Sequence, residues 1–457
     1  MKLGFDDIVR ATGGAPTREV RADASMRIST DTRALEPGDA FLALRGDNFD
    51  GHDFVGDAFA KGAVLAIVSR ADAIPPGKAG IAVADTLAAY MALAAAARLR
   101  VGGTLTAITG STGKTTTKSL LAQLLSLGGS KLAATPQNEN NEIGVSKLLL
   151  SLEGDEQHVI VEMGARHPGD IAQLVKIAQP QIGVLTNIGE AHLEIFGSRE
   201  ALADTKWGLF ATGAVGLLNV GDEESLRRAH LLANGCGWFG AGAAARNATD
   251  EQVPAALIPE RDKLVFADGE SRDVCDIKTN LPGEHNLANL AAAIVAARAL
   301  GMAPRAIVDA IPLLVLPPGR YERVALERGV NVIYDAYNAS LSGTVATLAA
   351  FAAEPAQRRI AILGGMAELG DESPRFHEQA GAAVRRCGID MLLAGGAHAD
   401  ATIRGALEAG MPAHAVLPYG DNDAAVDWLR SNLREGDCVL LKGSRAYKME
   451  QILEGLQ

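Results

Sequence analysis

The residues best suited to chemistry in this chain gather in the stretch 104–118, which reads TLTAITGSTGKTTTK. Its apolar first half suits a buried strand. Gly110 and Gly113 then allow a loop with positive φ, whose backbone amides can come close to a ligand. Lys114 would supply a point charge for the β- and γ-phosphates of a nucleotide, and the Thr115 hydroxyl suits a magnesium ion. The stretch therefore predicts a nucleotide site.

A helix is predicted to begin at Lys114, because apolar residues recur at helical spacing from 120 to 125. The amide-rich N-terminus of such a helix attracts phosphate. The loop spacing, G-x-x-G-K-T-T, is shorter than the general G-x-x-x-x-G-K-[ST], and an ordinary glycine-rich turn is the alternative. The order of strand, glycines, lysine, hydroxyls and helix favours the phosphate loop. Its predicted nucleotide contacts are Gly110, Ser111, Thr112, Gly113, Lys114, Thr115 and Thr116.

Two further strand ends are predicted to carry groups that face a metal ion. A buried strand at 158–163 contains Glu162, and another at 182–186 leads to His192. In open parallel sheets, ligands bind beyond the carboxyl ends of the strands. Glu162 and His192 are therefore placed to face the phosphates and magnesium. For His192 taken alone, a structural or surface histidine is the alternative.

Lys206 is an unusual residue because it shares the apolar face of a predicted helix with Leu202, Leu209 and Phe210. Ser198 is predicted to cap this helix. Burial lowers the pKa of a lysine, and a neutral amine can react with carbon dioxide to form a carbamate, which can coordinate magnesium. The alternative is that only the aliphatic part of the Lys206 side chain is buried and its ammonium group reaches solvent.

Other polar groups are candidates for substrate binding. Asn289 lies one turn into a predicted helix and is placed to hydrogen-bond a base edge. Lys442 and Arg445 end the last predicted strand and suit a carboxylate or a terminal phosphate, although a charged helix start is the alternative. In the first segment, several polar and glycine residues lie in loops next to predicted strands and are candidates for a binding site. The alternative is that these loops are simply solvated. The candidates are Ser29, Asp31, Arg33, Arg45 and Gly46.

Three domains are predicted to position these groups, at 1–98, 99–315 and 316–457. The fold class is α/β: a small α/β N-terminal domain, a central parallel sheet like that of P-loop ATPases, and a Rossmann-like C-terminal domain. Gly364 and Gly365 follow a strand as in a dinucleotide fingerprint, but no G-x-G-x-x-G is present there. Beyond those already named, strands are predicted at 41–44, 64–68, 330–334, 359–363, 391–394 and 438–442, and helices at 53–61 and 374–386.

Composition limits the possible functions. The chain has 457 residues, too many for one core, with 48% hydrophobic residues and a net charge of −12. This charge argues against a nucleic-acid binder. The four cysteines form no C-x-x-C pair, so reduced thiols in a cytoplasm are expected. Neither a signal peptide nor a membrane-spanning run is recognisable, so we expect a cytoplasmic protein without membrane insertion.

Four motifs together resemble the Mur ligase family of ATP-dependent amide ligases in peptidoglycan synthesis. The family's G-T-x-G-K-[ST], E-x-G, T-N-x-x-x-x-H and G-x-H-N-x-x-N patterns correspond to 110–116, 162–164, 186–192 and 283–289. The stretches TPQNENNEIGV, DAYNAS and GGMAELG, at 135–145, 335–340 and 364–370, resemble one branch of the family. That branch adds D-alanyl-D-alanine to UDP-N-acetylmuramoyl-tripeptide.

The resemblance implies an acyl-phosphate mechanism that uses ATP and two Mg²⁺ ions, with Lys206 carbamylated and Lys114, Glu162 and His192 also catalytic. It implies a monomer whose N-terminal, central and C-terminal domains hold the UDP end, MgATP and the second substrate. The implied metal ligands are Thr115, Glu162, His192 and Lys206. Further implied contacts are Arg320 and Asp335 for the nucleotide, and Asn138, Asn140, Asn141, Tyr337, Asn338, Ser340, Lys442 and Arg445 for the substrates.

Several positions depart from the family pattern. Gly208 stands where Glu is usual, Ser340 where Asn is, Gly365 where Asp is, and Ser146 where Pro is. The alternatives are a P-loop switch or motor, another Mur-type amino-acid ligase, and a ligase like folylpolyglutamate synthase. A GTPase switch should carry N-K-x-D, and a diaminopimelate-adding ligase should carry D-N-P-R; the sequence contains neither. These motifs do not distinguish Lys from diaminopimelate as the third residue of the tripeptide.

Overall fold

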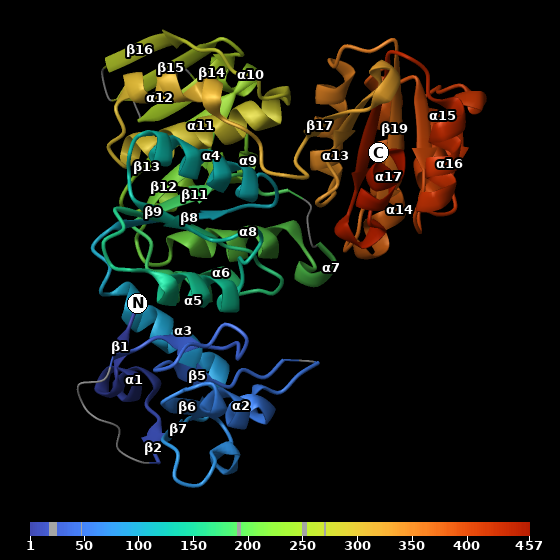
Figure 1. Ribbon diagram of the computed structural model, residues 1–457. Helices are drawn as coiled ribbons and strands as arrows, with labels where there is room; N and C mark the ends of the chain where they lie inside the picture. The colour runs from blue at the N-terminus through green and yellow to red at the C-terminus, as the bar shows by residue number, and fades with distance from the viewer. Residues whose placement is uncertain (18–24, 47, 190–192, 249–253, 269–270) are drawn as a thin grey trace.

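The computed structural model describes residues 1–17, 25–46, 48–189, 193–248, 254–268 and 271–457. Three larger sheets with flanking helices follow one another along the chain, and a two-stranded sheet accompanies the first (Figure 1). The mixed α/β class predicted from the sequence is confirmed. None of the helices in the described residues combines the length and apolar character that a membrane crossing requires.

The N-terminal sheet has the order β2-β7-β6-β5-β4, parallel except for the β2 edge, and β1 pairs with β3. The predicted helix at 53–61 is a 3₁₀ turn, Gly51–Phe54, followed by α2. The elements are β1 Leu3–Gly4, α1 Phe5–Thr12, β2 Ala15–Pro16, β3 Ser25–Met26, β4 Ile28–Ser29, β5 Ala40–Leu42, α2 Val55–Ala60, β6 Leu65–Val68, β7 Gly80–Ala82 and α3 Thr86–Arg98.

Helix α3 joins this part to the central sheet through a buried arginine. Arg98 Nε donates to Ala178 O at 3.0 Å, and its Nη2 donates to Gln181 Oε1 at 3.0 Å. The same Gln181 oxygen accepts the backbone N–H of Leu105, at the start of β8, at 2.8 Å. Because burial of an unpaired guanidinium is costly, these bonds fix α3 against the strand that leads to the phosphate loop.

The central sheet has the order β16-β15-β14-β13-β12-β11-β8-β10-β9 and is parallel from β9 to β14. Its strands are β8 Thr104–Thr109, β9 Leu132–Ala134, β10 His158–Glu162, β11 Ile182–Leu185, β12 Val215–Asn219, β13 Cys236–Ala241, β14 Ala255–Glu260, β15 Lys263–Asp268 and β16 Ser271–Asp276. Strand β8 lies between β10 and β11, so their carboxyl ends flank the phosphate loop.

Helices cover both faces of the central sheet (Figure 1). Apolar side chains of α4 and α11 form one core, and those of α5, α6 and α8 form the other, which continues into the N-terminal part. The helices are α4 Lys114–Leu127, α5 Glu142–Ser151, α6 Asp170–Ala178, α7 Leu193–Phe196, α8 Arg199–Trp207, α9 Glu223–Arg228, α10 Gly242–Asn247, α11 Gly283–Ala299 and α12 Pro304–Ala310. The predicted start of α4 at Lys114 is confirmed.

The C-terminal sheet has the order β17-β18-β22-β19-β20-β21, and only the β17 edge is antiparallel. Side chains of α13, α14 and α15 pack on one face and those of α16 and α17 on the other. The elements are β17 Glu322–Ala325, β18 Asn331–Tyr334, α13 Leu341–Ala352, β19 Arg358–Gly365, α14 Ser373–Arg386, β20 Met391–Ala394, α15 Ala399–Glu408, β21 Val416–Pro418, α16 Asn422–Asn432, β22 Asp437–Gly443 and α17 Glu450–Leu456.

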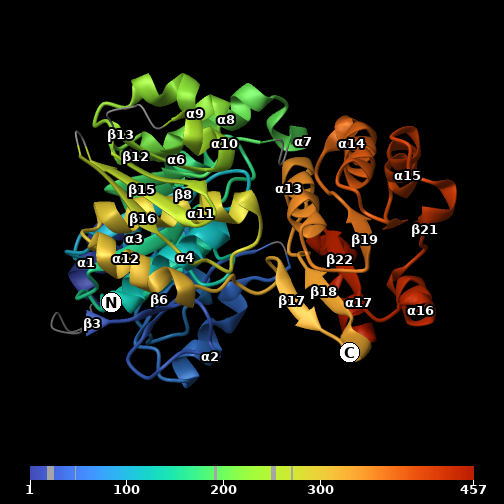
Figure 2. The same cartoon turned by 90° about the horizontal axis from the view of Figure 1, so that it is seen from above.

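The C-terminal part lies beside the central sheet, with α13 turned toward it (Figure 2). Helix α13 contacts the start of α11, where a β-carbon at Gly283 would come within 2.7 Å of Ala350 Cβ. Gly283 has φ +73, a conformation that glycine adopts without strain. This close approach brings the segment 335–347 toward the phosphate loop.

Candidate active site

The phosphate loop is a tight turn between β8 and α4 that only glycines permit. Gly110 has φ +150 and Gly113 has φ +81. A β-carbon at Gly110 would collide with Thr186 Oγ1, and one at Gly113 would collide with Asn289 Oδ1. The glycines therefore let Thr186, directly after β11, and Asn289 of α11 support the loop from behind.

Asn187, two residues after the end of β11, holds the loop in shape. Asn187 Oδ1 accepts the N–H of Thr112 at 3.1 Å, and its Nδ2 donates to Thr112 Oγ1 at 2.9 Å. Ser111 N donates to Asn187 O at 2.9 Å, and Gly189 N donates to Ser111 Oγ at 2.9 Å. These bonds order the loop before any ligand is present, which reduces the entropy cost of binding a phosphate.

Two lysines converge on one carbonyl of this loop. Lys114 Nζ donates to Gly110 O at 2.8 Å, and Lys206 Nζ donates to the same oxygen at 3.1 Å. Burial lowers the pKa of Lys114, and burial together with the Lys114 charge lowers the pKa of Lys206 well below its usual range. Lys206 is 2% exposed, which excludes the alternative with its ammonium in solvent. Ser198 caps α8 as predicted, accepting the N–H of Ala201 at 3.1 Å.

Glu162 lies at the end of β10, directly across from the start of α4. Its Oε1 accepts Thr115 Oγ1 at 3.1 Å and Asn140 Nδ2 at 2.9 Å. Lys118 Nζ forms an ion pair with Oε2 at 3.1 Å, but this buried oxygen has no hydrogen-bond partner within the described residues. The carboxylate is 1% exposed.

The Thr115 and Glu162 pair fits a magnesium ion. Mg²⁺ prefers hard oxygen ligands and keeps several waters. This pair offers a hydroxyl and a carboxylate, one oxygen of which accepts no hydrogen bond from the part of the chain that the structure describes. His192, the third ligand predicted from the sequence, lies outside the described residues. Lys206 Nζ is held against the phosphate loop by its hydrogen bond to the Gly110 carbonyl oxygen.

The C-terminal part contributes a second wall. The Arg320 guanidinium lies over the Tyr337 ring, 4.2 Å from its centroid, and the buried Arg320 Nε has no acceptor within the described residues. A buried donor without a partner favours an anion. Asp335 accepts Thr347 Oγ1 at 2.6 Å and pairs with Lys442 at 3.0 Å. Burial raises the pKa of Asp335, but the Lys442 charge and these hydrogen bonds outweigh it and leave that pKa below its usual value.

The two walls enclose one cavity of about 1000 Å³. Its lining includes the phosphate loop, Glu162, Lys206, Asn289, Arg320 and Asp335. It also includes five polar residues predicted to contact the substrates, namely Asn138, Asn140, Asn141, Tyr337 and Asn338, and the predicted Ser340 and Lys442. Residues from 111 to 442 thus meet around a space large enough for a nucleotide and part of a second substrate.

Models of three families match consecutive parts of the chain. The Mur ligase family catalytic domain matches 26–104, the Mur ligase middle domain 108–297, and the Mur ligase glutamate ligase domain 319–445. A UDP-N-acetylmuramoyl-tripeptide–D-alanyl-D-alanine ligase of Synechocystis sp. is 36% identical over 437 residues, 94% of this chain and 91% of the relative. The chain belongs to the Mur ligase family.

Solved structures of Mur ligases agree with this membership. MurF from Acinetobacter baumannii is 28% identical, covers 100% of this chain and 99% of its own, and superposes with a TM-score of 0.87. MurF from Thermotoga maritima in complex with ADP is 29% identical, covers 94% and 97%, and gives a TM-score of 0.79. The similarity thus extends over essentially the whole chain.

The N-terminal candidates are placed apart from this cavity. Arg33 is exposed and pairs with Asp31. The hydrogen bonds from Arg33 lower the pKa of Asp31 to about 2. Ser29 Oγ donates to Asp31 O at 3.0 Å. Arg45 and Gly46 are exposed on a neighbouring loop. None of the five is among the described residues that line the cavity. Their role in holding the UDP end stays a prediction.

Three other candidates have local partners. Ser340 Oγ accepts the N–H of Gly343 at 3.2 Å and so caps α13, and Lys442 Nζ donates to Asn338 O at 2.9 Å. Arg445 is exposed and is not among the described lining residues. Asn289 accepts Thr117 Oγ1 at 3.4 Å. These bonds show how each side chain is oriented, and their ligand contacts stay predictions.

Sequence reasoning left out several residues of the site. Lys118 forms an ion pair with the Glu162 carboxylate at 3.1 Å, and its spacing of one helical turn from Lys114 was an available signal. His285, which belongs to the 283–289 motif but received no role from the sequence, also lines the cavity, and burial lowers its pKa to about 4. Arg166 and His167 line it from the loop after β10, where the sequence ARHPGD has the polar character of a strand-end loop.

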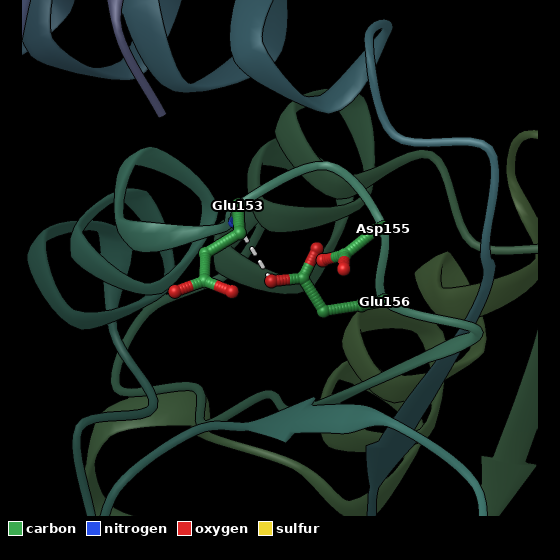
Figure 3. Close-up of side chains that lie close together, drawn as sticks. All are labelled: Glu153, Asp155 and Glu156. Carbon is green, nitrogen blue, oxygen red and sulfur yellow. Dashed lines mark hydrogen bonds between the residues drawn. The ribbon is translucent and has the colours of Figure 1, made fainter.

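The negative charge of an acidic turn before β10 is balanced by backbone N–H groups and by Lys131. Glu153, Asp155 and Glu156 place their carboxylate oxygens within 4.8 Å of one another (Figure 3). Glu156 accepts the backbone N–H groups of Glu153 and Gly154, at 2.7 and 2.9 Å, and Lys131 pairs with both Glu153 and Asp155. These contacts explain the cluster as a closed turn.

Proposed function

We propose that this Mur ligase joins D-alanyl-D-alanine to UDP-N-acetylmuramoyl-tripeptide with the hydrolysis of ATP, in cytoplasmic peptidoglycan precursor synthesis. The observation that carries the proposal is the single cavity in which the phosphate loop faces the 335–340 segment, in a chain 36% identical to a relative named for this reaction. One chain supplies both walls, which supports action as a monomer. The proposed domains are 1–98, 99–315 and 316–457.

In the first step, a carboxylate oxygen of the tripeptide attacks the γ-phosphorus of ATP, and ADP leaves. Phosphoryl transfer needs alignment and charge neutralisation more than covalent help from the protein. Lys114 and Arg320 line the cavity and would supply positive charge from opposite walls, and residues 111–113 line it where their backbone amides can bind phosphate oxygens. Thr115 and Glu162 would hold a magnesium ion, which would supply charge neutralisation for the transferring phosphate.

In the second step, the dipeptide amine attacks the acyl carbon, an amide bond forms and inorganic phosphate leaves. Water must be excluded until then, and closure of the C-terminal part over the cavity serves this purpose. Tyr337, Asn338 and Ser340 line the cavity near Lys442, and they offer neutral and positive groups for a dipeptide zwitterion. Arg445, on the same strand end, would bind its carboxylate.

A carbamate on Lys206 is the second part of the proposal. Its amine is 2% exposed, its pKa is lowered well below the usual range, and the Lys114 charge lies beside it. A neutral amine in this position can accept carbon dioxide, and the anion formed would be attracted by Lys114 and available to magnesium. His192 would take part in the same site.

The rate of phosphate release with different acceptors tests which reaction the enzyme catalyses. Purified protein with MgATP and UDP-N-acetylmuramoyl-tripeptide should release phosphate rapidly when D-alanyl-D-alanine is added. Single amino acids, D-alanine, L-glutamate and diaminopimelate, should support only a small fraction of that rate. Comparison of tripeptides with Lys and with diaminopimelate then identifies the natural donor. Rapid turnover with one amino acid and none with the dipeptide would contradict the proposal and assign the chain to another branch of the family.

A further inference from the structure

Lys118 is a buried cation on the face of α4 that turns toward β10. It follows Thr115 by three residues, so both side chains lie on one side of the helix, and each contacts Glu162. Lys118 is 6% exposed and is not among the described residues that line the cavity. It therefore acts from behind the cavity wall.

The second contact of Lys118 is the segment 136–141, PQNENN, which we call the asparagine loop. Lys118 Nζ donates to Gln137 O at 2.6 Å. Gln137 has φ +38, a left-handed conformation that is unfavourable for a residue with a side chain. The bond to a buried ammonium compensates for this local cost, because a charged donor forms a stronger hydrogen bond than a neutral one.

The asparagine loop is also joined to the end of β10. Asn140 Nδ2 donates to Glu162 Oε1 at 2.9 Å, and Gly164 N donates to Asn140 O at 2.8 Å. One carboxylate thus contacts Thr115 and Lys118 of α4 and Asn140 of the asparagine loop. Since Asn138, Asn140 and Asn141 line the cavity, a shift of Glu162 would also shift the loop.

We propose that Lys118 is a positioning residue that fixes the Glu162 carboxylate and the asparagine loop as one unit. It would thereby link the metal side of the nucleotide site to the site of the UDP-linked peptide. The second half rests on the proposed function, because the loop is assigned to that substrate there. The first half, the hold on Glu162, depends only on magnesium and nucleotide.

The test separates the two contacts. Calorimetry measures ADP affinity with and without Mg²⁺, and kinetics measures KM for UDP-N-acetylmuramoyl-tripeptide. In Lys118→Met, metal-free ADP affinity should stay within about twofold of wild type, while the gain from Mg²⁺ falls and KM rises, each about tenfold. Adding Gln137→Gly should recover most of the KM loss, because glycine adopts positive φ without strain, and none of the Mg²⁺ loss.

Two further variants keep the result decisive. Lys131→Met removes an exposed lysine that pairs with the acidic turn, and it should leave every value unchanged. Should Lys118→Met not fold, Lys118→Arg decides: its charge should preserve the Mg²⁺ gain, whereas its planar fork should misplace the 2.6 Å bond to Gln137 and raise KM about fivefold, correctable by Gln137→Gly.

Unchanged Mg²⁺ gain and unchanged KM in Lys118→Met would overturn the inference. So would a Gln137→Gly variant that restores the Mg²⁺ gain rather than KM, or a Lys118→Arg variant with a normal KM and a lost Mg²⁺ gain. If wild-type protein does not turn over the UDP precursor, the proposed function fails, and the calorimetric comparison still decides whether Lys118 holds Glu162.

Discussion

Two parallel strands of this protein end in glycines, and they differ in what occupies the space beside those glycines. After β8, Gly110 and Gly113 make room for polar side chains that support a loop, and the loop faces the cavity. At the end of β19, a β-carbon at Gly364 would collide with Met449 Sδ, and one at Gly365 would lie 2.9 Å from the Tyr447 ring. The first strand end is open to a ligand and the second is filled by the protein itself.

The strand next to β19 shows the same feature. A β-carbon at Gly395 would collide with the Tyr419 ring, and one at Gly396 with the Tyr447 ring. Glycines after a parallel strand therefore provide only space. A charged group such as Lys114, or a buried donor such as Arg320 Nε, which has no acceptor within the described residues, converts that space into a site.

Removal of the cation at the open strand end should have the largest effect. Lys114→Ala should lower kcat for phosphate release by about 10²–10³-fold, because the charge that meets the transferring phosphate is lost. Steady-state phosphate release with saturating substrates measures this. Lys448→Ala, beyond the filled end, is the matched control and should keep the wild-type rate. A folded Lys114→Ala protein with near-normal ligation would remove the basis of the comparison.

At Lys206, the second lysine of the open strand end, activity should depend on the reactive amine as well as on the charge. Lys206→Arg should lose at least about 10²-fold in rate, because a guanidinium stays charged and forms no carbamate. Wild-type enzyme in carbon-dioxide-free buffer should slow, and added bicarbonate should restore it. The variant should show no such recovery. Full activity of Lys206→Arg, or no dependence of the wild type on bicarbonate, would exclude the carbamate.

One substitution at each strand end tests the comparison directly. Gly113→Ala should weaken ADP binding about tenfold or more, because φ +81 and the collision with Asn289 displace the loop. Gly365→Ala, at φ +107 against the Tyr447 ring, should cost about 1–3 kcal/mol of stability and leave ADP affinity unchanged. Calorimetric binding and thermal unfolding measure the two effects.

The double variant Gly365→Ala with Tyr447→Ala supplies the control for the filled end. Removal of the ring should relieve the contact, so that the alanine at 365 costs less in this background than in the wild type. Equal costs in both backgrounds, or a loss of ADP binding from Gly365→Ala, would show that the strand end after β19 is not simply filled space.

The smallest effect is expected at the start of α11, where His285 is half-buried. Its pKa is lowered to about 4, so the unfolded chain binds the proton more readily, and stability is lost as pH falls from about 6.5 toward 4. The shift is worth at most about 3 kcal/mol. His285→Gln should reduce the decrease in Tm between pH 7 and pH 4.5. An equal decrease in both proteins would place the acid sensitivity elsewhere.

Local patterns in the sequence were sufficient for the main elements. The β8 strand, the start of α4 at Lys114 and the Ser198 cap each depend on residues within a few positions of one another, and all three are confirmed. The α/β class and the family membership are likewise confirmed. These features are predictable because helix capping, alternation and glycine conformations are properties of short segments.

The tertiary structure alone decided which groups meet and which spaces stay open. Nothing near Lys118 in the sequence indicates that its ammonium reaches Gln137, and nothing near Gly365 indicates that the Tyr447 ring lies against it. Residues 114 and 206 share one carbonyl because the start of α4 and the end of α8 both approach the phosphate loop, although the two lysines lie 92 positions apart in the chain. Such contacts depend on the register of sheets and the packing of helices, which are set by the whole core rather than by any local pattern.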